Sequence, residues 1–389
     1  MSENQIPHIP DLELAQQLFV LSSPPLSETH DTVRKSVVER IRAEALAPLW
    51  LEYKHLLSFD QSEYESLKKI NDEKIQELDA KIKEAEESFG EAEVANAEKE
   101  KAEYLAKIGE KDKAVEAYKH TATKSPGLGS KIDLIFSQIR IGLFFSDHQM
   151  VKSGIDDAKI LIDKGGDWER RNRLKAYNGI YFLSIRDFSA ASSLLLDVLS
   201  TFTSTELLSY DEIVKYAVIA GVVSLSRVDM KTKLIDSPEV LQVLPVQYSP
   251  LDTLINSLYL CDYARFFKSL AEIEGLYIKT SRYVAPHTRY FIKEMRKRAY
   301  AQLLESYRAL SIESMARAFG VSVEFLDAYV VSRILSNNLS SDLSIIETNR
   351  PDNKNAQYQA VVKQGDLLLN KLQKYQAAVR ISGMEKVVA

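Results

Sequence analysis

Three breaks in the helical pattern recur at nearly equal intervals, and this repetition constrains the fold more than any other feature of the chain. The breaks begin at Gly109, Ser146 and Arg186, 37 and then 40 residues apart, and an apolar helical segment lies on either side of each. A helix–turn–helix unit of about that length is typical of tetratricopeptide-like repeats. Such units bury their apolar faces by stacking, so we expect a helical solenoid that offers a long surface to partners. Generic helical hairpins are the alternative interpretation.

Composition supports a mostly α-helical fold. The chain has 389 residues, of which 45% are hydrophobic and 27% are charged, as in ordinary globular proteins. It contains only 14 glycines and 11 prolines, which leaves few tight turns. A chain of this length is expected to form two or three domains.

A segment near the C-terminus, residues 311–326, predicts a helix-turn-helix. Gly320 suits the left-handed conformation at the end of its first helix, and Ser322 can cap the second. Residues 337–348 combine turn residues with apolar ones and predict a hairpin wing. We therefore expect a winged helix over residues 311–350. The first helix carries its apolar residues at a spacing of three and four positions: Ile312, Met315, Ala316 and Phe319.

A winged helix often binds DNA, but the charges of this one argue against that function. Its second helix, residues 323–335, carries Glu324, Asp327 and Arg333, a net charge of −1. A recognition helix instead brings cationic or amide side chains to phosphates and base edges. We expect the wing to bind a neighbouring protein, whose strand would extend its open edge. The candidate residues of this surface are Leu339, Leu343, Ile345 and Ile346.

The N-terminal part divides into two segments. Residues 1–30 show little periodicity and include two adjacent prolines, so we expect an extended lead-in. Residues 31–107 predict a long, acidic helical segment, in which residues 61–103 hold fourteen acidic residues and seven lysines. Its apolar positions make barely two heptads, too few for a free coiled coil, and predict a solvated helix laid on a neighbour. Those positions are Ile75, Leu78, Ile82, Ala85 and Phe89.

The C-terminal segment, residues 351–389, predicts an assembly helix that begins near Asn355. Because the domain before it is already complete, its apolar stripe has nothing of its own left to cover, and a bundle of partner helices would bury it. The alternative is that the helix folds back on the chain's own repeats, residues 108–310. The stripe contains Tyr358, Val362, Leu368, Leu369, Leu372 and Tyr375.

The sequence contains no recognisable catalytic or metal-binding motif. Its six histidines are scattered singly, and none lies at a metal-ligand spacing from another histidine or from Cys261, the one cysteine. It has no P-loop and no glycine-rich dinucleotide motif. We therefore predict no catalytic residue, no cofactor and no metal, and hence a protein that is not an enzyme.

Other features bear on the compartment. A single cysteine allows no internal disulfide, and the N-terminus lacks signal-peptide character, so we expect a cytoplasmic and nuclear protein. The longest apolar run, residues 216–225, is too short to cross a bilayer, and no membrane contact is expected.

Two basic clusters could form a nucleic-acid groove. Neither has interleaved aromatic residues for base stacking, so nucleic acid is an unlikely partner, and salt bridges to acidic helices of neighbouring subunits or a plain solvated face are the other interpretations. The first cluster contains Arg170, Arg171, Arg173 and Lys175, and the second contains Arg289, Lys293, Arg296, Lys297 and Arg298.

The order of helical repeats, winged helix and terminal helix resembles the PCI family, whose scaffold subunits occur in the proteasome lid, the signalosome and translation initiation factor three. Several segments are similar to one lid family in particular, the seventh non-ATPase subunit of the proteasome regulatory particle. The similarity covers most of the chain from about residue 40 to 378. The segments that carry it are residues 166–177, 285–296, 302–307, 347–358 and 365–370.

The resemblance implies a non-catalytic scaffold subunit of the lid, which serves ATP-dependent degradation of ubiquitinated proteins within a hetero-oligomer. The implied partners are other PCI subunits, deubiquitinase subunits of the lid, the ATPase base and the core particle. The deubiquitinase metal motif is absent here, so that activity would belong to a partner. A PCI scaffold subunit of the signalosome and an RNA-associated PCI protein are the alternatives.

Overall fold

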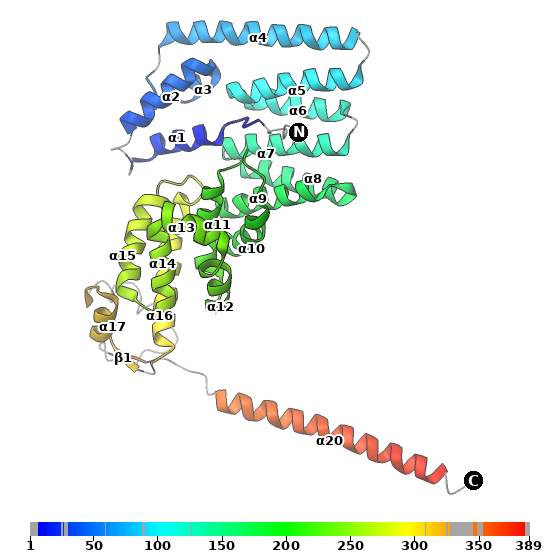
Figure 1. Ribbon diagram of the computed structural model, residues 1–389, viewed down its shortest axis with the longest axis vertical. Coiled ribbons are helices and arrows are strands. Elements are labelled where there is room, and N and C mark those ends of the chain that lie inside the picture. Colours follow the sequence, from blue (N-terminus) through cyan, green and yellow to red (C-terminus); the bar gives the residue numbers. More distant parts are fainter. Residues whose placement is uncertain are drawn as a thin grey trace. The chain divides into compact units, whose positions relative to one another are not determined.

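The fold is described from a computed structural model of the whole chain (Figure 1). It describes residues 7–24, 26, 30–58, 60–87, 90–125, 127–307, 309–323, 326, 345–347 and 353–385. Nearly all of these residues are helical, which confirms the predicted mostly α-helical class. The chain divides into two compact units, residues 1–299 and 300–389, and each is described by itself.

The first unit is a succession of helices that pack on their neighbours in sequence (Figure 1). Its first half contains α1 (Leu12–Ser22), α2 (His30–Glu44), α3 (Ala47–Glu52), α4 (Gln61–Glu87), α5 (Glu91–Ile108), α6 (Lys111–Lys124), α7 (Leu128–Phe144) and α8 (His148–Gly165). Its second half contains α9 (Trp168–Ser184), α10 (Phe188–Val198), α11 (Tyr210–Ser224), α12 (Arg227–Met230), α13 (Pro238–Gln247), α14 (Ser249–Leu260), α15 (Tyr263–Ile273) and most of α16 (Thr288–Leu304).

Four helical hairpins, α5–α6, α7–α8, α9–α10 and α14–α15, turn at a residue with left-handed backbone. The three predicted breaks are confirmed, with φ of 91° at Gly109, 57° at Ser146 and 70° at Arg186. A fourth left-handed residue, Cys261 with φ of 64°, was not predicted. A left-handed residue directly after a helix lets the last carbonyls find donors while the chain reverses. The hairpin is thus the repeating unit of this part of the chain.

The acidic residue that follows three of these turns caps the second helix of the hairpin. The side chains of Asp147, Asp187 and Asp262 each accept a hydrogen bond from the backbone N–H three residues further on, at 3.0, 3.0 and 3.3 Å. Each cap satisfies an amide that the helix itself leaves without a partner. A left-handed residue followed by Asp therefore fixes where the second helix begins.

The core lies between facing helices along the stack, and the helices approach one another closely inside a hairpin. Tyr118, Tyr177 and Tyr216 are among its largest fully buried side chains. A Cβ atom placed on Gly179 of α9 would lie only 2.6 Å from the Leu195 side chain of α10. The absence of a side chain at this glycine is what lets α9 and α10 pack at that distance.

The predicted extended lead-in over residues 1–30 is wrong for α1, which is a helix with five buried residues. Asp11 caps it, since its carboxylate accepts a hydrogen bond from the Glu13 backbone N–H at 2.8 Å. The adjacent prolines that suggested an extended chain follow the helix, which ends at Ser22. The apolar spacing therefore outweighs the prolines, because burial against α2 and α7 stabilises this helix. The buried residues are Leu12, Leu14, Ala15, Leu18 and Leu21.

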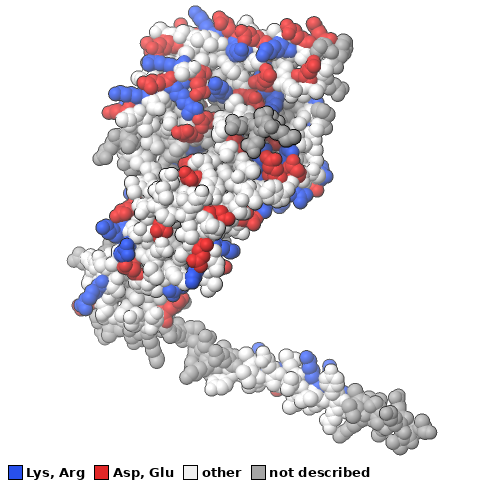
Figure 2. All heavy atoms as spheres, viewed as in Figure 1, with Lys and Arg blue, Asp and Glu red and all other residues white. Residues whose placement is uncertain are grey.

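The predicted long helix laid on a neighbour is α4, which packs against α5. Leu78 is buried, Ile75, Ile82 and Ala85 are half-buried, and Phe89 lies outside the described residues. The Tyr104 hydroxyl donates to Asn71 Oδ1 at 2.9 Å, so a polar contact also joins the two helices. Figure 2 shows acidic and basic side chains interspersed over this part of the unit. The segment 31–107 is therefore four helices with a largely solvated outer surface.

In the second unit the described residues form the end of α16, two short strands and two further helices: β1 (Ala309–Ser311), α17 (Ile312–Phe319), β2 (Ile345–Glu347) and α20 (Asn353–Glu385). The strands pair antiparallel, with Leu310 opposite Ile346. The helical repeats, expected to run to residue 310, thus end earlier, because the chain leaves α16 at Leu304 and forms β1.

The first half of the helix-turn-helix agrees with its prediction. All four expected apolar residues of α17 are buried, and Gly320 has φ of 65°. Ser311 caps α17, since its hydroxyl accepts a hydrogen bond from the Ser314 backbone N–H at 3.2 Å. The Phe319 ring meets that of Tyr300 edge to face, with centroids 4.9 Å apart. Most of the predicted second helix, residues 323–335, lies outside the described residues.

Candidate protein interaction surface

The described ranges offer surfaces for contact, and no group of metal-binding side chains lies among them. Within the same ranges, no helix combines the length and the hydropathy needed to span a bilayer. The candidate site is therefore built from the exposed apolar and charged groups.

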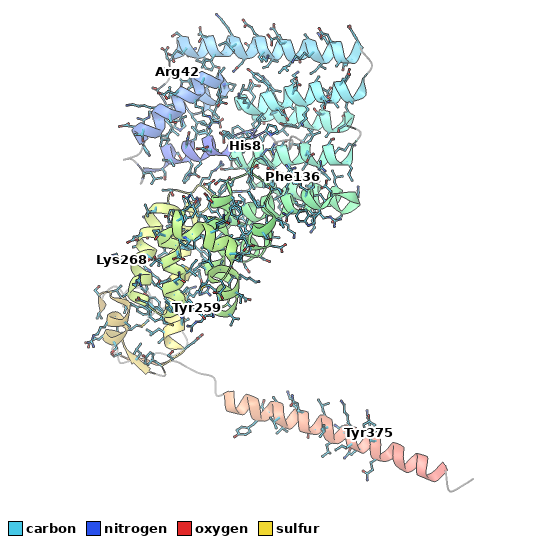
Figure 3. All side chains as sticks on the ribbon, in the orientation of Figure 1. His8, Arg42, Phe136, Tyr259, Lys268 and Tyr375 are labelled. Atoms are coloured by element: carbon cyan, nitrogen blue, oxygen red, sulfur yellow. The ribbon has the colours of Figure 1, made fainter. Side chains whose placement is uncertain are left out.

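The terminal helix α20 carries an apolar stripe with no cover. Every described side chain from residue 358 to 376 is exposed, including Tyr358 at 68%, Leu372 at 60% and Tyr375 at 71%. Figure 3 shows Tyr375 projecting from this helix. The six predicted stripe residues all lie on α20, where their spacing of mostly three or four positions places them along one side. An uncovered stripe on a helix of 33 residues is a surface suited to other helices.

The predicted wing surface is only partly described. Ile345 and Ile346 lie in β2, whose partner strand is β1. Leu339 and Leu343 lie outside the described residues. A hairpin is expected within residues 337–348, whereas the strand at its end, β2, pairs with β1, which directly precedes α17.

The first basic cluster is paired within the chain. Arg170 binds Asp133, with Nη2 and Oδ2 2.6 Å apart, and Lys175 binds Asp197. Arg173 is 4% exposed and pairs with Glu206, which is 1% exposed. Only Arg171 of the four is exposed without such a partner. These cations consequently join neighbouring helices and form no free groove.

Arg173 belongs to a buried network that links α7 to α9. Glu206 Oε1 accepts from Arg173 Nη2 at 2.9 Å and from the Tyr177 hydroxyl at 3.0 Å. Arg140 Nη1 in turn donates to the Tyr177 hydroxyl oxygen at 3.1 Å. Burial raises the pKa of Tyr177 above its usual range, so this hydroxyl keeps its proton. The Phe136 ring stacks on that of Tyr177, deep in the stack of helices (Figure 3).

The second basic cluster is largely used inside the first unit. Both terminal nitrogens of Arg298 donate to main-chain carbonyls, those of Val222 and Leu225. Burial lowers the pKa of Arg298. Lys297 pairs with Glu294 at 2.8 Å, and Arg289 remains exposed. Arg298 and Lys297 of this cluster are therefore already engaged within the first unit.

Two positioning residues were missed in the sequence, Arg282 and Gln16. Arg282 donates to the carbonyl of Phe144 at 2.9 Å, and its backbone N–H donates to Gln16 Oε1 at 3.1 Å. No spacing rule links residues more than 260 positions apart. Co-variation between the two positions is the signal that would have found this pair.

These features first indicate the broad class of protein to which the chain belongs. Helical hairpins that lead into the first helix of the predicted helix-turn-helix and a paired strand, and then into an uncovered terminal helix, fit a PCI protein, and residues 276–347 match the PCI domain. Residues 60–233 match the family described as 26S proteasome subunit RPN7, and residues 357–379 match the RPN7/PSMD6 C-terminal helix.

Relatives agree over nearly the whole chain. The chain is 49% identical to the 26S proteasome regulatory subunit rpn7 of Schizosaccharomyces pombe, over 95% of this chain and 96% of that protein. It is 42% identical to the 26S proteasome non-ATPase regulatory subunit 6 homolog of Arabidopsis thaliana, over 94% and 96%. COP9 signalosome complex subunit 1 of Arabidopsis thaliana is 23% identical over half of this chain and 45% of its own length. The chain belongs to the family of the 26S proteasome regulatory subunit RPN7.

Proposed function

We propose that this chain is a non-catalytic scaffold subunit of the lid of the proteasome regulatory particle, and that it works in the cytoplasm and the nucleus. The observation that carries the proposal is the coincidence of the uncovered stripe of α20 with the match to the family's C-terminal helix, residues 357–379. Burial of one large apolar side chain is worth about 1.5–3 kcal/mol. The six stripe residues together would supply a strong interface even after the costs of association.

The proposed contacts follow from the two surfaces. The stripe of α20 would join helices of the deubiquitinase subunits in a bundle. The strand β2 and the wing around it would pair with other PCI subunits through backbone hydrogen bonds. The first unit, with its solvated outer helices, would reach toward the ATPase base and the core particle.

Two alternatives are less well supported. A signalosome subunit would be expected to match the COP9 relative better than the proteasome relatives, yet that relative has 23% identity over half of the chain, against 49% over 95% for the fission-yeast protein. An RNA-associated protein would need free cations, but Arg173 and Arg298 are held inside the first unit.

Truncation tests the proposal. A chain that ends at Asn355 should remain folded, because the side chains removed between residues 358 and 376 are exposed. It should no longer enter the lid when it replaces the full chain in cells, as measured by affinity purification of a lid subunit and identification of the bound proteins. Normal incorporation of the truncated chain would refute the role of the helix. Copurification of the full chain with cullins, in place of proteasome ATPases, would refute the assignment to the lid.

A further inference from the structure

One segment of the first unit, Thr280–Arg298, reaches the C-terminal ends of three alternate helices of the stack. We call it the strap. It contains the loop after α15, the short helical turn Ala285–His287 and the first part of α16. Its three basic contacts are to α7, α9 and α11, the helices that precede the turns or loops after residues 144, 184 and 224.

Arg282 holds the end of α7. One of its terminal nitrogens donates to the carbonyls of Leu143 and Phe144 and lies 3.0 Å from the Ser146 hydroxyl. Ser146 is the left-handed residue of the α7–α8 turn. The guanidinium therefore fixes both the last helical turn and the reversal that follows.

His287 and Arg298 hold the next two ends. His287 Nε2 lies 2.8 Å from the Ser184 carbonyl of α9, and because a carbonyl can only accept, Nε2 carries the proton. Arg298 donates to the carbonyls of Val222 and Leu225 at the end of α11. The start of the strap makes one more contact with α11, because the hydroxyls of Ser281 and Tyr216 are 2.8 Å apart.

All three contacts are made to carbonyl groups at the C-terminal ends of helices. The last four carbonyls of a helix have no partner inside the helix, and the macrodipole gives that end a partial negative charge. Three such ends lie along one strap, and each meets an arginine or a histidine N–H donor from it. The strap consequently fixes the ends of α7, α9 and α11 relative to one another.

The helix α1 forms hydrogen bonds with the start of the strap. The Gln16 side-chain amide donates to the Thr280 carbonyl and accepts from the Arg282 backbone N–H. One side chain therefore binds the main chain of the strap at two positions. α1 is anchored on its other sides as well. Asp11, its cap, pairs with Arg40 of α2, and the Ile9 carbonyl accepts from Arg140 Nε of α7 at 3.0 Å.

We propose that α1 is a clasp that keeps the strap closed, so that the N-terminal segment and the start of the PCI region, residue 276 onward, form one conformational unit. Any event that displaces α1 loosens the ends of the repeat helices, and any event that opens the strap loosens α1. This coupling goes beyond a scaffold role, because it makes the stability of α1 and that of the helix ends depend on one another. It requires only contacts within residues 1–299.

Hydrogen exchange of the full chain tests the clasp. Gln16→Met keeps the length and helix propensity of the side chain but removes both hydrogen bonds. We expect amide exchange to rise about fivefold to tenfold in residues 280–285 and in the last turn of α7, residues 141–146, as for the loss of one or two hydrogen bonds. Gln242→Met, on the exposed face of α13, is the matched control and should change neither segment.

The reciprocal variant completes the test. Arg282→Met should raise exchange within α1 as well as in residues 141–146, because a coupling between two sites acts in both directions. If Gln16→Met raises exchange only inside α1, or if Arg282→Met leaves α1 as protected as before, the clasp is refuted. Circular dichroism of both variants establishes that the repeats remain folded.

Discussion

Glu206 accepts a hydrogen bond from Arg173 in the interior of the first unit, with Oε1 and Nη2 2.9 Å apart. The guanidinium also lies over the Phe136 ring, 4.8 Å from its centroid. Arg173 comes from α9, Glu206 from the loop after α10 and Phe136 from α7, so the three residues together join two hairpins. An ion pair in this position is sensitive to loss of either member, because the remaining charge would be buried alone.

Arg173→Ala should accordingly lower the free energy of unfolding by about 3–5 kcal/mol, measured by urea denaturation. Lys175→Ala is the control two residues away. It breaks a pair with Asp197 whose side chains are 42% and 58% exposed, and should cost less than about 1 kcal/mol. Equal costs for the two variants would contradict the interior role of Arg173.

Stability should depend on pH through Asp147. A hydrogen bond from Lys111, at 2.7 Å, holds the pKa of this carboxyl below its ordinary value of 3.8, as does the cap bond from Met150. Because the folded pKa is lowered, the stabilisation is present above the unfolded pKa and is lost as the pH falls below about 4.

Asp147→Asn isolates this charge, since asparagine can still cap the helix. The difference in unfolding free energy between the parent and this variant should be under about 1 kcal/mol at pH 6 and should vanish toward pH 2. Asp147→Ala also loses the cap, and should cost about 1 kcal/mol more at any pH. A difference for Asp147→Asn that does not depend on pH would show that Lys111 contributes nothing.

The face of α20 proposed to bind partners can be tested with two leucines that lie two positions apart. Leu369→Asp changes the stripe, whereas Leu367→Asp changes a residue that is equally exposed, at 63% against 58%, on another side of the helix. We expect Leu369→Asp to lower incorporation into the lid at least tenfold and Leu367→Asp to have little effect. Neither should change the thermal midpoint of the isolated chain. Equal losses for both would refute a single binding face.

The contact between Phe319 and Tyr300 should be a main source of stability in the second unit. Phe319 is 1% exposed, and Phe319→Ala should cost about 3–5 kcal/mol of local stability through the cavity it leaves. Faster amide exchange in residues 312–319 would show this. Val323→Ala, at a site 42% exposed, should leave the same amides within twofold of the parent.

Sequence alone was sufficient where the signal is local. The buried face of α17, the three hairpin turns and the start of α20 each follow from residues within a few positions of one another. The turn at Cys261 carries the same signal as that at Ser146, a left-handed residue followed by Asp, and could have been found with it. It lies 75 residues after Arg186, close to two of the 37- to 40-residue intervals, and it was missed because the helix end midway, at Leu225, has no left-handed residue.

The remaining features depend on tertiary contacts. The helix α1 owes its existence to burial against α2 and α7, and a neighbouring pair of prolines hid it. The strand β1 forms because Leu310 meets Ile346, which is distant in sequence. A binding surface was one interpretation of the basic clusters, because a sequence shows the charged residues but not the residues with which they pair. The wing residues Leu339 and Leu343 remain predictions.

The bare stripe of α20 also has a consequence for the cell. A chain made in excess of its partners would carry the stripe from Tyr358 to Tyr375 uncovered. At a rise of 1.5 Å per residue this is on the order of 25 Å of helix with exposed apolar side chains, and such surfaces promote self-association. Synthesis matched to the other subunits, or prompt removal of surplus copies, would then be a condition of solubility. The exposed apolar side chains of α20 thus give a physical reason for balanced expression of the subunits.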